Sequence, residues 1–353
     1  MKKQILSVMM LLFTSVFFVA CTHGQGAHTT EGMQALAEYR YEDAVTCFRE
    51  AEDAGEEEIY FWRGLGIAHM GLLDYETAVT DFKTALSGNG MVVDSLTVDI
   101  NYYLAACYYK LGRYEDSIQI YDAILNYKKK DADAFFLRGN ARLYLSDYAL
   151  AAEDFDAAIA AAEHPVDMSV DVYLAYSDAG DEARGKAYLE NGKALKKGLL
   201  TPIEEGRLYF YLGDYKTAVG KLEVLREKDD ADAEALLLLG RAYEALGDLN
   251  YATMVYDKYV SNYPVKDARS AGIYNRLGML YLESGDSVKA LQAFSEAMQI
   301  PDNGIMQTLK FNEIVAYERG GDFATAEVLM NDYLKIYPDD EVAQKEYIFL
   351  STR

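Results

Sequence analysis

The stretch Leu236–Pro264, LLLLGRAYEALGDLNYATMVYDKYVSNYP, decides the fold of this chain. Its first half has the composition of a helix, yet Gly240 occupies the apolar face. Glycine there costs about 0.5–1 kcal/mol relative to alanine. Another small residue, Ala252, follows twelve positions later, and Tyr256 and Tyr259 follow it at helical spacing. A glycine placed at a cost in this setting indicates that a neighbouring segment approaches closely.

The same ladder of small, small, large and small residues recurs without a fault in five stretches, such as Gly66, Ala78, Phe82 and Ala85. Less regular copies, in which some of these positions carry other residues, also occur. Successive copies start 34, 39, 34, 34, 33, 34, 38 and 36 residues apart. The first positions of the nine copies are Gly32, Gly66, Ala105, Gly139, Tyr173, Gly206, Gly240, Gly278 and Ile314. Self-similarity at such a period is the signature of a repeat architecture.

Three stretches show the repeat most fully. They are FWRGLGIAHMGLLDYETAVTDFKTAL (61–86), RLYFYLGDYKTAVGKL (207–222) and IYNRLGMLYLESGDSVKALQAFSEAM (273–298). On these residues the chain resembles the tetratricopeptide repeat family over about residues 25–340. The resemblance implies an all-α fold, a TPR-type α-solenoid in which antiparallel helix pairs form a right-handed superhelix. About nine repeats then span residues 31–340, and residues 341–353 form a C-terminal capping helix.

Helices of one pair pack at 8–10 Å between axes. We therefore expect Gly240 and Ala252 to meet where the two helices of their pair approach most closely. The large residue, such as Tyr256, is expected to fill the space toward the next repeat. The fifth repeat, DVYLAYSDAGDEARGKAYLENGKAL (171–195), has Tyr173 and Gly185 at the ladder positions and the least certain register.

The N-terminus reads as a separate segment. Residues 1–20 combine two lysines with an apolar run over 5–19, too short for a membrane-spanning helix, and they are expected to be a signal peptide. The following FVAC (18–21) resembles a bacterial lipobox, which implies lipidation of Cys21 and a short tether over 21–30. The alternative is an ordinary signal peptide with a coincidental cysteine. The expected location is the bacterial cell envelope, extracytoplasmic and lipid-anchored to the membrane.

The net charge limits the classes of partner that the chain can bind. The chain carries 57 acidic and 34 basic residues, a formal net charge of −23. This balance argues against nucleic acid as a partner, because phosphate binding draws on clustered basic residues.

Cys47 and Cys107 lie two repeats apart, too far for a disulfide between stacked repeats, and are expected to be small buried side chains.

Signatures of catalysis are absent from the sequence. No G-x-x-x-x-G-K, H-E-x-x-H or G-x-S-x-G motif occurs, and the four histidines are scattered. Carboxylates are so frequent that no pair can be singled out as acid and base. We therefore predict no enzyme activity, no catalytic residue, no metal site and no cofactor.

Without a catalytic motif, the functional feature that we expect is a binding surface. In the family, residues on the inner face of the first helices touch bound peptides. Here those positions mix aromatic, arginine and asparagine side chains, which are enriched in protein interfaces. The carried-over residues are Tyr60, Arg63, Tyr102, Tyr109, Phe136, Asn140, Tyr144, Arg207, Phe210, Tyr211, Arg241 and Asn275. The family's lysine–asparagine clamp for a peptide carboxylate is absent, because Phe136 stands four residues before Asn140.

The sequence thus predicts a non-enzymatic, membrane-anchored scaffold that binds a protein or peptide through the concave face of the solenoid. The alternative is an exported receptor for a small molecule or glycan. Tyrosine rings can stack on sugars and the chain has 30 tyrosines, although Trp62 is its single tryptophan.

Overall fold

The computed structural model describes residues 26–88, 93–195, 199–226, 232–263, 268–301 and 303–352. The predicted signal segment, residues 1–20, and the lipidation candidate Cys21 lie outside these ranges, as does Pro264. Within them the chain is helical, with loops and without strands. The predicted all-α fold of stacked helix pairs is therefore confirmed.

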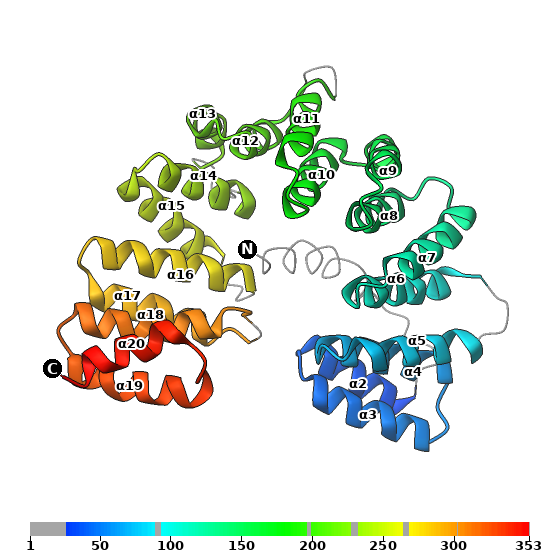
Figure 1. Cartoon of the computed structure of the whole chain (residues 1–353), viewed down its shortest axis with the longest axis horizontal. Helices are drawn as coiled ribbons and strands as arrows, with labels where there is room; N and C mark the ends of the chain where they lie inside the picture. The colour runs from blue at the N-terminus through cyan, green and yellow to red at the C-terminus, as the bar shows by residue number, and fades with distance from the viewer. Residues whose placement is uncertain are drawn as a thin grey trace. The chain divides into compact units, whose positions relative to one another are not determined.

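The helices form two compact units, Met1–Gly198 and Leu199–Arg353, called the N-terminal and C-terminal units below. In each unit the antiparallel pairs follow one another in chain order (Figure 1). The N-terminal unit contains α2 (Ala27–Ala37), α3 (Tyr41–Asp53), α4 (Glu58–Gly71), α5 (Tyr75–Gly88), α6 (Ser95–Lys110), α7 (Tyr114–Tyr127), α8 (Ala132–Tyr144), α9 (Tyr148–Ala161), α10 (Pro165–Asp178) and α11 (Glu182–Gly192). The C-terminal unit contains α12 (Pro202–Tyr211), α13 (Tyr215–Arg226), α14 (Ala233–Ala245), α15 (Leu249–Asn262), α16 (Ala268–Glu283), α17 (Ser287–Met298), α18 (Met306–Arg319), α19 (Phe323–Ile336) and α20 (Glu341–Leu350), which packs on α19.

The turns within pairs explain where the helices end. Gly285, after α16, has φ +84°, a conformation that residues with a Cβ rarely adopt. The next residue, Asp286, donates its backbone N–H to the carbonyl of Tyr281 at 2.8 Å. Its side chain then accepts the backbone N–H of Lys289 at 3.0 Å and caps α17. The sequence order Gly-Asp therefore stops one helix and starts its partner.

The ladder glycines make room for a ring. A Cβ built at Gly240 would lie 2.7 Å from Cζ of Tyr256, on the second helix of the same pair, and one at Gly278 would lie 2.8 Å from Cδ1 of Phe294. We expected the large residue to fill the space toward the next repeat. Phe82 and Phe155 do contact rings of the next pair, Tyr103 and Tyr176. The ring also packs on the glycine of its own pair, where a Cβ would leave it no room.

The ring of Phe48 packs against glycines of two successive repeats. A Cβ at Gly32, in the same pair as Phe48, would lie 2.6 Å from Cε1 of that ring. A Cβ at Gly64, on the first helix of the next pair, would lie 2.7 Å from Cε2. The expectation that the ring reaches the next repeat therefore holds for Phe48, in addition to its packing within the pair.

The two small ladder positions lie together where the structure shows their contacts. In the third pair Ser117 Oγ donates to the carbonyl of Ala105 at 2.9 Å. In the fifth pair the order is reversed, since the first helix carries Tyr173 and the second carries Gly185. A Cβ at Gly185 would approach the carbonyl oxygen of Tyr173 to 2.9 Å. The glycine has moved to the second helix, which leaves the same close approach between the two backbones.

Tyrosine hydroxyls and carboxylates join successive pairs. Tyr281 on α16 donates to Asp257 on α15 at 2.7 Å, and Tyr243 on α14 donates to Glu223 on α13. Both tyrosines stand three residues after a ladder glycine. Burial raises the pKa of the Tyr281 hydroxyl, and the hydrogen bond to Asp257 raises it further, so the phenol stays a proton donor. This repeated bond gives the abundant tyrosines and carboxylates a structural use.

Two glycines of the C-terminal unit provide a matched test of this packing. Alanine in place of a helical glycine gains about 1 kcal/mol from helix propensity, but overpacking a tight site costs about 1–3 kcal/mol. Gly220→Ala has nothing within 4 Å of the new Cβ and is expected to stabilise the protein. Gly278→Ala meets the Phe294 ring and is expected to destabilise it by about 1 kcal/mol. Chemical denaturation of both variants checks this, and equal gains in stability would contradict it.

Candidate partner-binding face

The first helices of the N-terminal unit carry the candidate face. On α8, the residues Asp133, Phe136, Asn140 and Tyr144 follow at intervals of three, four and four. Side chains at these intervals project from one side of a helix. Three of these four residues belong to the predicted site, and α8 contacts α10, the first helix of the next pair.

Two predicted residues link neighbouring pairs. Arg63 on α4 donates from Nε to Asp99 Oδ2 on α6 at 2.7 Å, and its guanidinium lies 5.4 Å from the ring centre of Tyr103. Tyr102 on α6 donates to Asp131 Oδ1, before α8, at 2.6 Å. Tyr60, also on α4, is half-buried. The polar groups of Arg63 and Tyr102 are therefore already bonded within the protein.

An aromatic cluster fills the ends of these helices. Tyr109 packs edge-on against Tyr114 and Tyr144, with ring centres 5.3 and 5.4 Å apart. Tyr114 and Tyr144 are stacked at 5.1 Å. Tyr109 is buried, as is Phe136, whose ring packs against Phe155. Tyr109 and Phe136 thus belong to the core, and Tyr144, which is half-buried, forms the edge of the cluster.

Asn140 differs from its neighbours. Its relative exposure is 9%, yet its side-chain amide has no hydrogen-bond partner among the described residues. Its nitrogen and oxygen are also not among the fully enclosed unsatisfied atoms, so the tip of the side chain meets solvent. Water can bond this amide in the free protein, so its donor and acceptor are open to exchange with a ligand. A ligand on this face can supply the missing donor and acceptor.

The predicted residues of the C-terminal unit form separate contacts. Arg207 on α12 is paired with Glu234 on α14. The guanidinium of Arg241 lies 4.8 Å from the ring centre of Phe210, and the Phe210 ring packs edge-on against Tyr211 at 5.2 Å. Asn275 on α16 accepts a hydrogen bond from Asn312 on α18 at 2.8 Å. Phe210 is buried, so its ring supports Arg241 and is not itself open to a partner.

Sequence reasoning missed a row of carboxylates on α10, the first helix of the pair that follows the pair of Asn140. On α10, Asp167, Asp171 and Asp178 share one face, at intervals of four and seven. We call these three residues and Asp133 of α8 the acidic strip. Their spacing along α10 was the available signal, but the abundance of carboxylates in the sequence hid it. Asp133 and Asp178 are exposed, and Asp167 and Asp171 are half-buried.

The acidic strip lies in a partly enclosed setting. Burial raises the pKa of the Asp133 carboxyl, and the neighbouring charge of Asp131 raises it further, while Lys128 lowers it. Burial also raises the pKa of Asp178. Both side chains nevertheless remain open to solvent.

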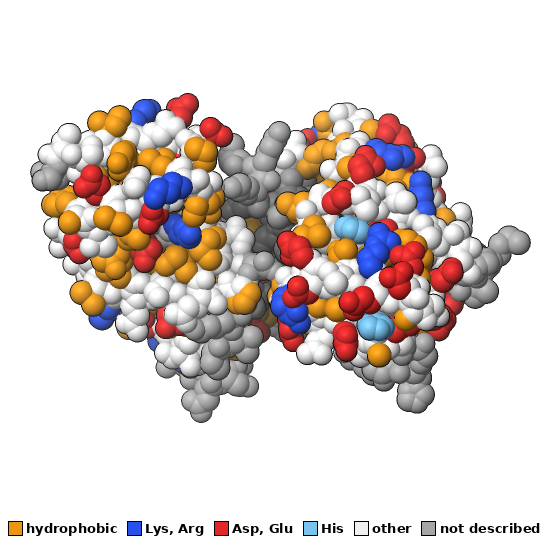
Figure 2. All heavy atoms as spheres, turned by 90° about the horizontal axis from the view of Figure 1, so that it is seen from below, with side chains coloured by type: hydrophobic (Ala, Val, Ile, Leu, Met, Phe, Trp, Pro, Cys, Tyr) orange, Lys and Arg blue, Asp and Glu red, His pale blue; other side chains and the backbone are white. Residues whose placement is uncertain are grey.

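Figure 2 shows one face of the molecule on which the two units differ. The N-terminal unit, marked by its pale-blue histidines, is densely set with Asp and Glu on that face. The C-terminal unit shows more hydrophobic side chains there. Several side chains of its second helices are well exposed, among them Val288 and Val328. The two units therefore offer different surfaces to a partner.

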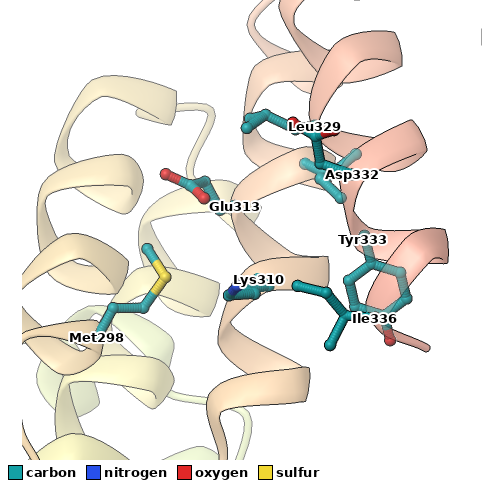
Figure 3. A pocket seen from close by; sticks show the side chains of 8 residues that line it. Met298, Lys310, Glu313, Leu329, Asp332, Tyr333 and Ile336 are labelled. Atoms are coloured by element: carbon teal, nitrogen blue, oxygen red, sulfur yellow. The ribbon is translucent and has the colours of Figure 1, made fainter.

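A small cavity lies in the C-terminal unit between α17, α18 and α19 (Figure 3). Its volume is about 110 Å³, and its lining includes Met298, Lys310, Glu313, Tyr333 and Ile336. Burial raises the pKa of Glu313, with Lys310 opposing the shift. Pockets for drug-sized ligands measure about 300–1,000 Å³. This cavity is too small to enclose a ligand of that size.

The cysteines give a direct test of burial. Burial raises the pKa of the Cys107 thiol to about 12, and the charge of Asp81 adds to the shift. Because the thiolate is the reactive form, Cys107 in a chain with Cys21→Ala and Cys47→Ala is expected to resist iodoacetamide while folded and to react fully once denatured. Mass spectrometry measures the labelled fraction. Rapid labelling of the folded chain would show that this core is open.

Two kinds of feature are absent from the part of the chain that the structure describes. No helix there combines the length and apolar character needed to cross a bilayer. No group of three or more histidine, cysteine or acidic side chains converges there as a metal ion would require.

Family models agree with this architecture. One model, described as a tetratricopeptide repeat, matches residues 64–135 and 203–267, and a second with the same description matches residues 271–303. Together with the stacked helix pairs, these matches show that the chain is a tetratricopeptide repeat protein. Its fold is that of a protein-interaction scaffold. No curated protein matches the sequence.

Two solved structures illustrate the likeness. A tetratricopeptide repeat protein from Parabacteroides merdae ATCC 43184 is 17% identical, with a TM-score of 0.43, over 82% of this chain and 99% of that one. A human IFIT1 dimer with PPP-AAAA is 16% identical, with a TM-score of 0.44, over 92% of this chain and 86% of that one. At these TM-scores the ligand of IFIT1 carries no inference about this chain.

Proposed function

We propose that this protein is a non-enzymatic scaffold, lipid-anchored in a bacterial cell envelope, that binds a protein or peptide partner. The binding face is formed by α6, α8 and α10 of the N-terminal unit. The observation that carries this proposal is Asn140, a nearly buried amide without a protein partner on the face that the predicted residues share. A peptide backbone offers the donor and acceptor that this amide lacks.

Site-specific photo-crosslinking tests the face. A photoreactive amino acid at position 140 is expected to form a crosslink to one or a few partners in cells. The same residue at position 153, on the exposed side of α9, serves as the control. Partners captured from position 140 alone support the proposal. Identical products from both positions, or no product from position 140, would contradict it.

The lipid anchor rests on FVAC and on Cys21, which lies outside the described residues. Two or more acyl chains hold a protein stably on a membrane. Cys21→Ala is therefore expected to move the protein from the membrane fraction to the soluble fraction and to prevent incorporation of labelled palmitate. A variant that stays fully membrane-bound would show that this cysteine is not the anchor.

We expect nucleic acid not to bind the candidate face, because the negative charges of the acidic strip repel phosphate groups. The test is fluorescence anisotropy with a 5′-triphosphorylated oligo-adenosine, the ligand class of the IFIT1 structure. No saturable binding is expected at moderate salt. Saturable binding that Asn140→Ala weakens would replace the peptide with RNA as the occupant of this face.

A further inference from the structure

We propose that the cavity between α17, α18 and α19 binds a small zwitterion with an apolar group, namely an α-amino acid with an aliphatic side chain. The apolar lining receives the side chain, while Lys310 and Glu313 receive the carboxylate and the ammonium group. This site lies within the C-terminal unit. It goes beyond the proposed function, which concerns helices of the N-terminal unit.

The apolar part of the cavity comes from three helices. Met298 of α17, Ile314 of α18, and Leu329 and Ile336 of α19 all line it. Ile314 is buried, whereas the Ile336 side chain is 54% exposed, so the lining extends from the core to the solvent. An aliphatic group that enters the cavity is therefore removed from water together with part of Ile336, which favours its binding.

The size of the cavity limits its occupant. Its volume is about 110 Å³. An apolar cavity of about 150 Å³ holds one benzene molecule, so by proportion this cavity suits about three or four carbon atoms. The side chains of valine and leucine have this size.

Two opposite charges stand at this cavity without ion pairs. Lys310 and Glu313 are one turn apart on α18, and Figure 3 shows both side chains extending toward Met298 of α17. Neither side chain forms an ion pair or a hydrogen bond with another residue of the described ranges. Burial raises the pKa of Glu313, although the charge of Lys310 lowers it, so an arriving ammonium group would offset the cost of the buried carboxylate. An amine alone would leave Lys310 unpaired, and a carboxylate alone would leave Glu313 unpaired.

The other polar groups of the lining already have partners. Asp332 is exposed and accepts a hydrogen bond from Lys335 at 2.7 Å. The hydroxyl of Tyr333 donates to Asp340 Oδ2 at 2.6 Å. The two unpaired charges on α18 are therefore the polar features that the lining offers to a ligand, and an amino acid carries both complementary charges on one carbon atom.

Methyl NMR of the full-length chain in detergent tests this site. The chain carries methionine labelled with carbon-13 at its methyl group, and Met298→Leu identifies the resonance of Met298. L-leucine is expected to shift that resonance saturably. Leucinamide, which lacks the carboxylate, and N-acetyl-leucine, which lacks the ammonium group, are each expected to bind about tenfold more weakly. Glycine, which lacks the aliphatic group, is expected to give no saturable shift.

Two double variants show whether the charges at the cavity bind the ligand. Lys310→Gln combined with Glu313→Gln is expected to weaken leucine binding by more than about tenfold. The matched control, Glu341→Gln combined with Lys345→Gln, removes one exposed charge of each sign from α20, outside the lining, and is expected to leave the affinity unchanged.

Three results would overturn the amino-acid site. They are an equal affinity for leucine in both double variants, an affinity for leucinamide or N-acetyl-leucine equal to that for leucine, and no saturable shift of the Met298 resonance with leucine. Crosslinking from position 140 reports on the other unit, so it tests the proposed function separately from each of these results.

Discussion

Phe155→Ala is expected to lower the free energy of unfolding by about 4 kcal/mol. The Phe155 side chain is fully buried, and its ring lies 5.9 Å from that of Phe136 in its own pair. It lies 5.3 Å from Tyr176 and 6.3 Å from Tyr188, both in the next pair. Truncation leaves a cavity shared by two repeats, and neither pair of helices can close it alone.

Urea denaturation followed by circular dichroism measures this loss. Tyr127→Ala is the control, since this ring is 55% exposed on α7 in the same unit. It is expected to change stability by less than about 0.5 kcal/mol. A loss of similar size in both variants would show that Phe155 does not join the two pairs.

Asp154→Asn is expected to cost about 3 kcal/mol. Asp154 Oδ1 accepts Nη2 of Arg138 at 2.6 Å, and Oδ2 accepts Nη1 of Arg142 at 2.8 Å. The side-chain exposure of the aspartate is 3%, and that of each arginine is 15%. Asparagine keeps the shape but leaves two largely buried guanidinium groups without this counter-charge.

Asp122→Asn is the matched control for this network. Asp122 bonds the other side of Arg138 at 2.5 Å, but its side chain is 47% exposed. Water replaces an exposed partner readily, so the expected loss is below about 1 kcal/mol. Denaturant midpoints of the two variants give the comparison. If Asp122→Asn costs as much as Asp154→Asn, burial does not set the strength of these pairs.

The fold could be predicted because its determinants are local and repeated. Gly240, Ala252 and Tyr256 stand in a fixed order that returns about every 34 residues. The partner of the glycine was harder to predict. Sequence spacing places Gly240 and Tyr256 on facing sides of a pair, but only packing shows that the ring occupies the space above the glycine.

The site was less predictable, because the family's positions specify a helix face and not its exposure. Phe136 and Phe210 are core residues here, since neighbouring helices cover their rings. Asn140 stays a candidate because its amide lacks a partner in the structure as described, which no sequence pattern reveals. The acidic strip was overlooked because 57 acidic residues mask any single row.

The position of Phe48 between Gly32 and Gly64 also limits how this protein can diverge. Either glycine can gain a methyl group only if the ring withdraws, and a smaller side chain at position 48 leaves voids beside both. In descendants of this chain, the three sites are therefore expected to change as a coordinated set, even though position 64 belongs to a different repeat from the other two.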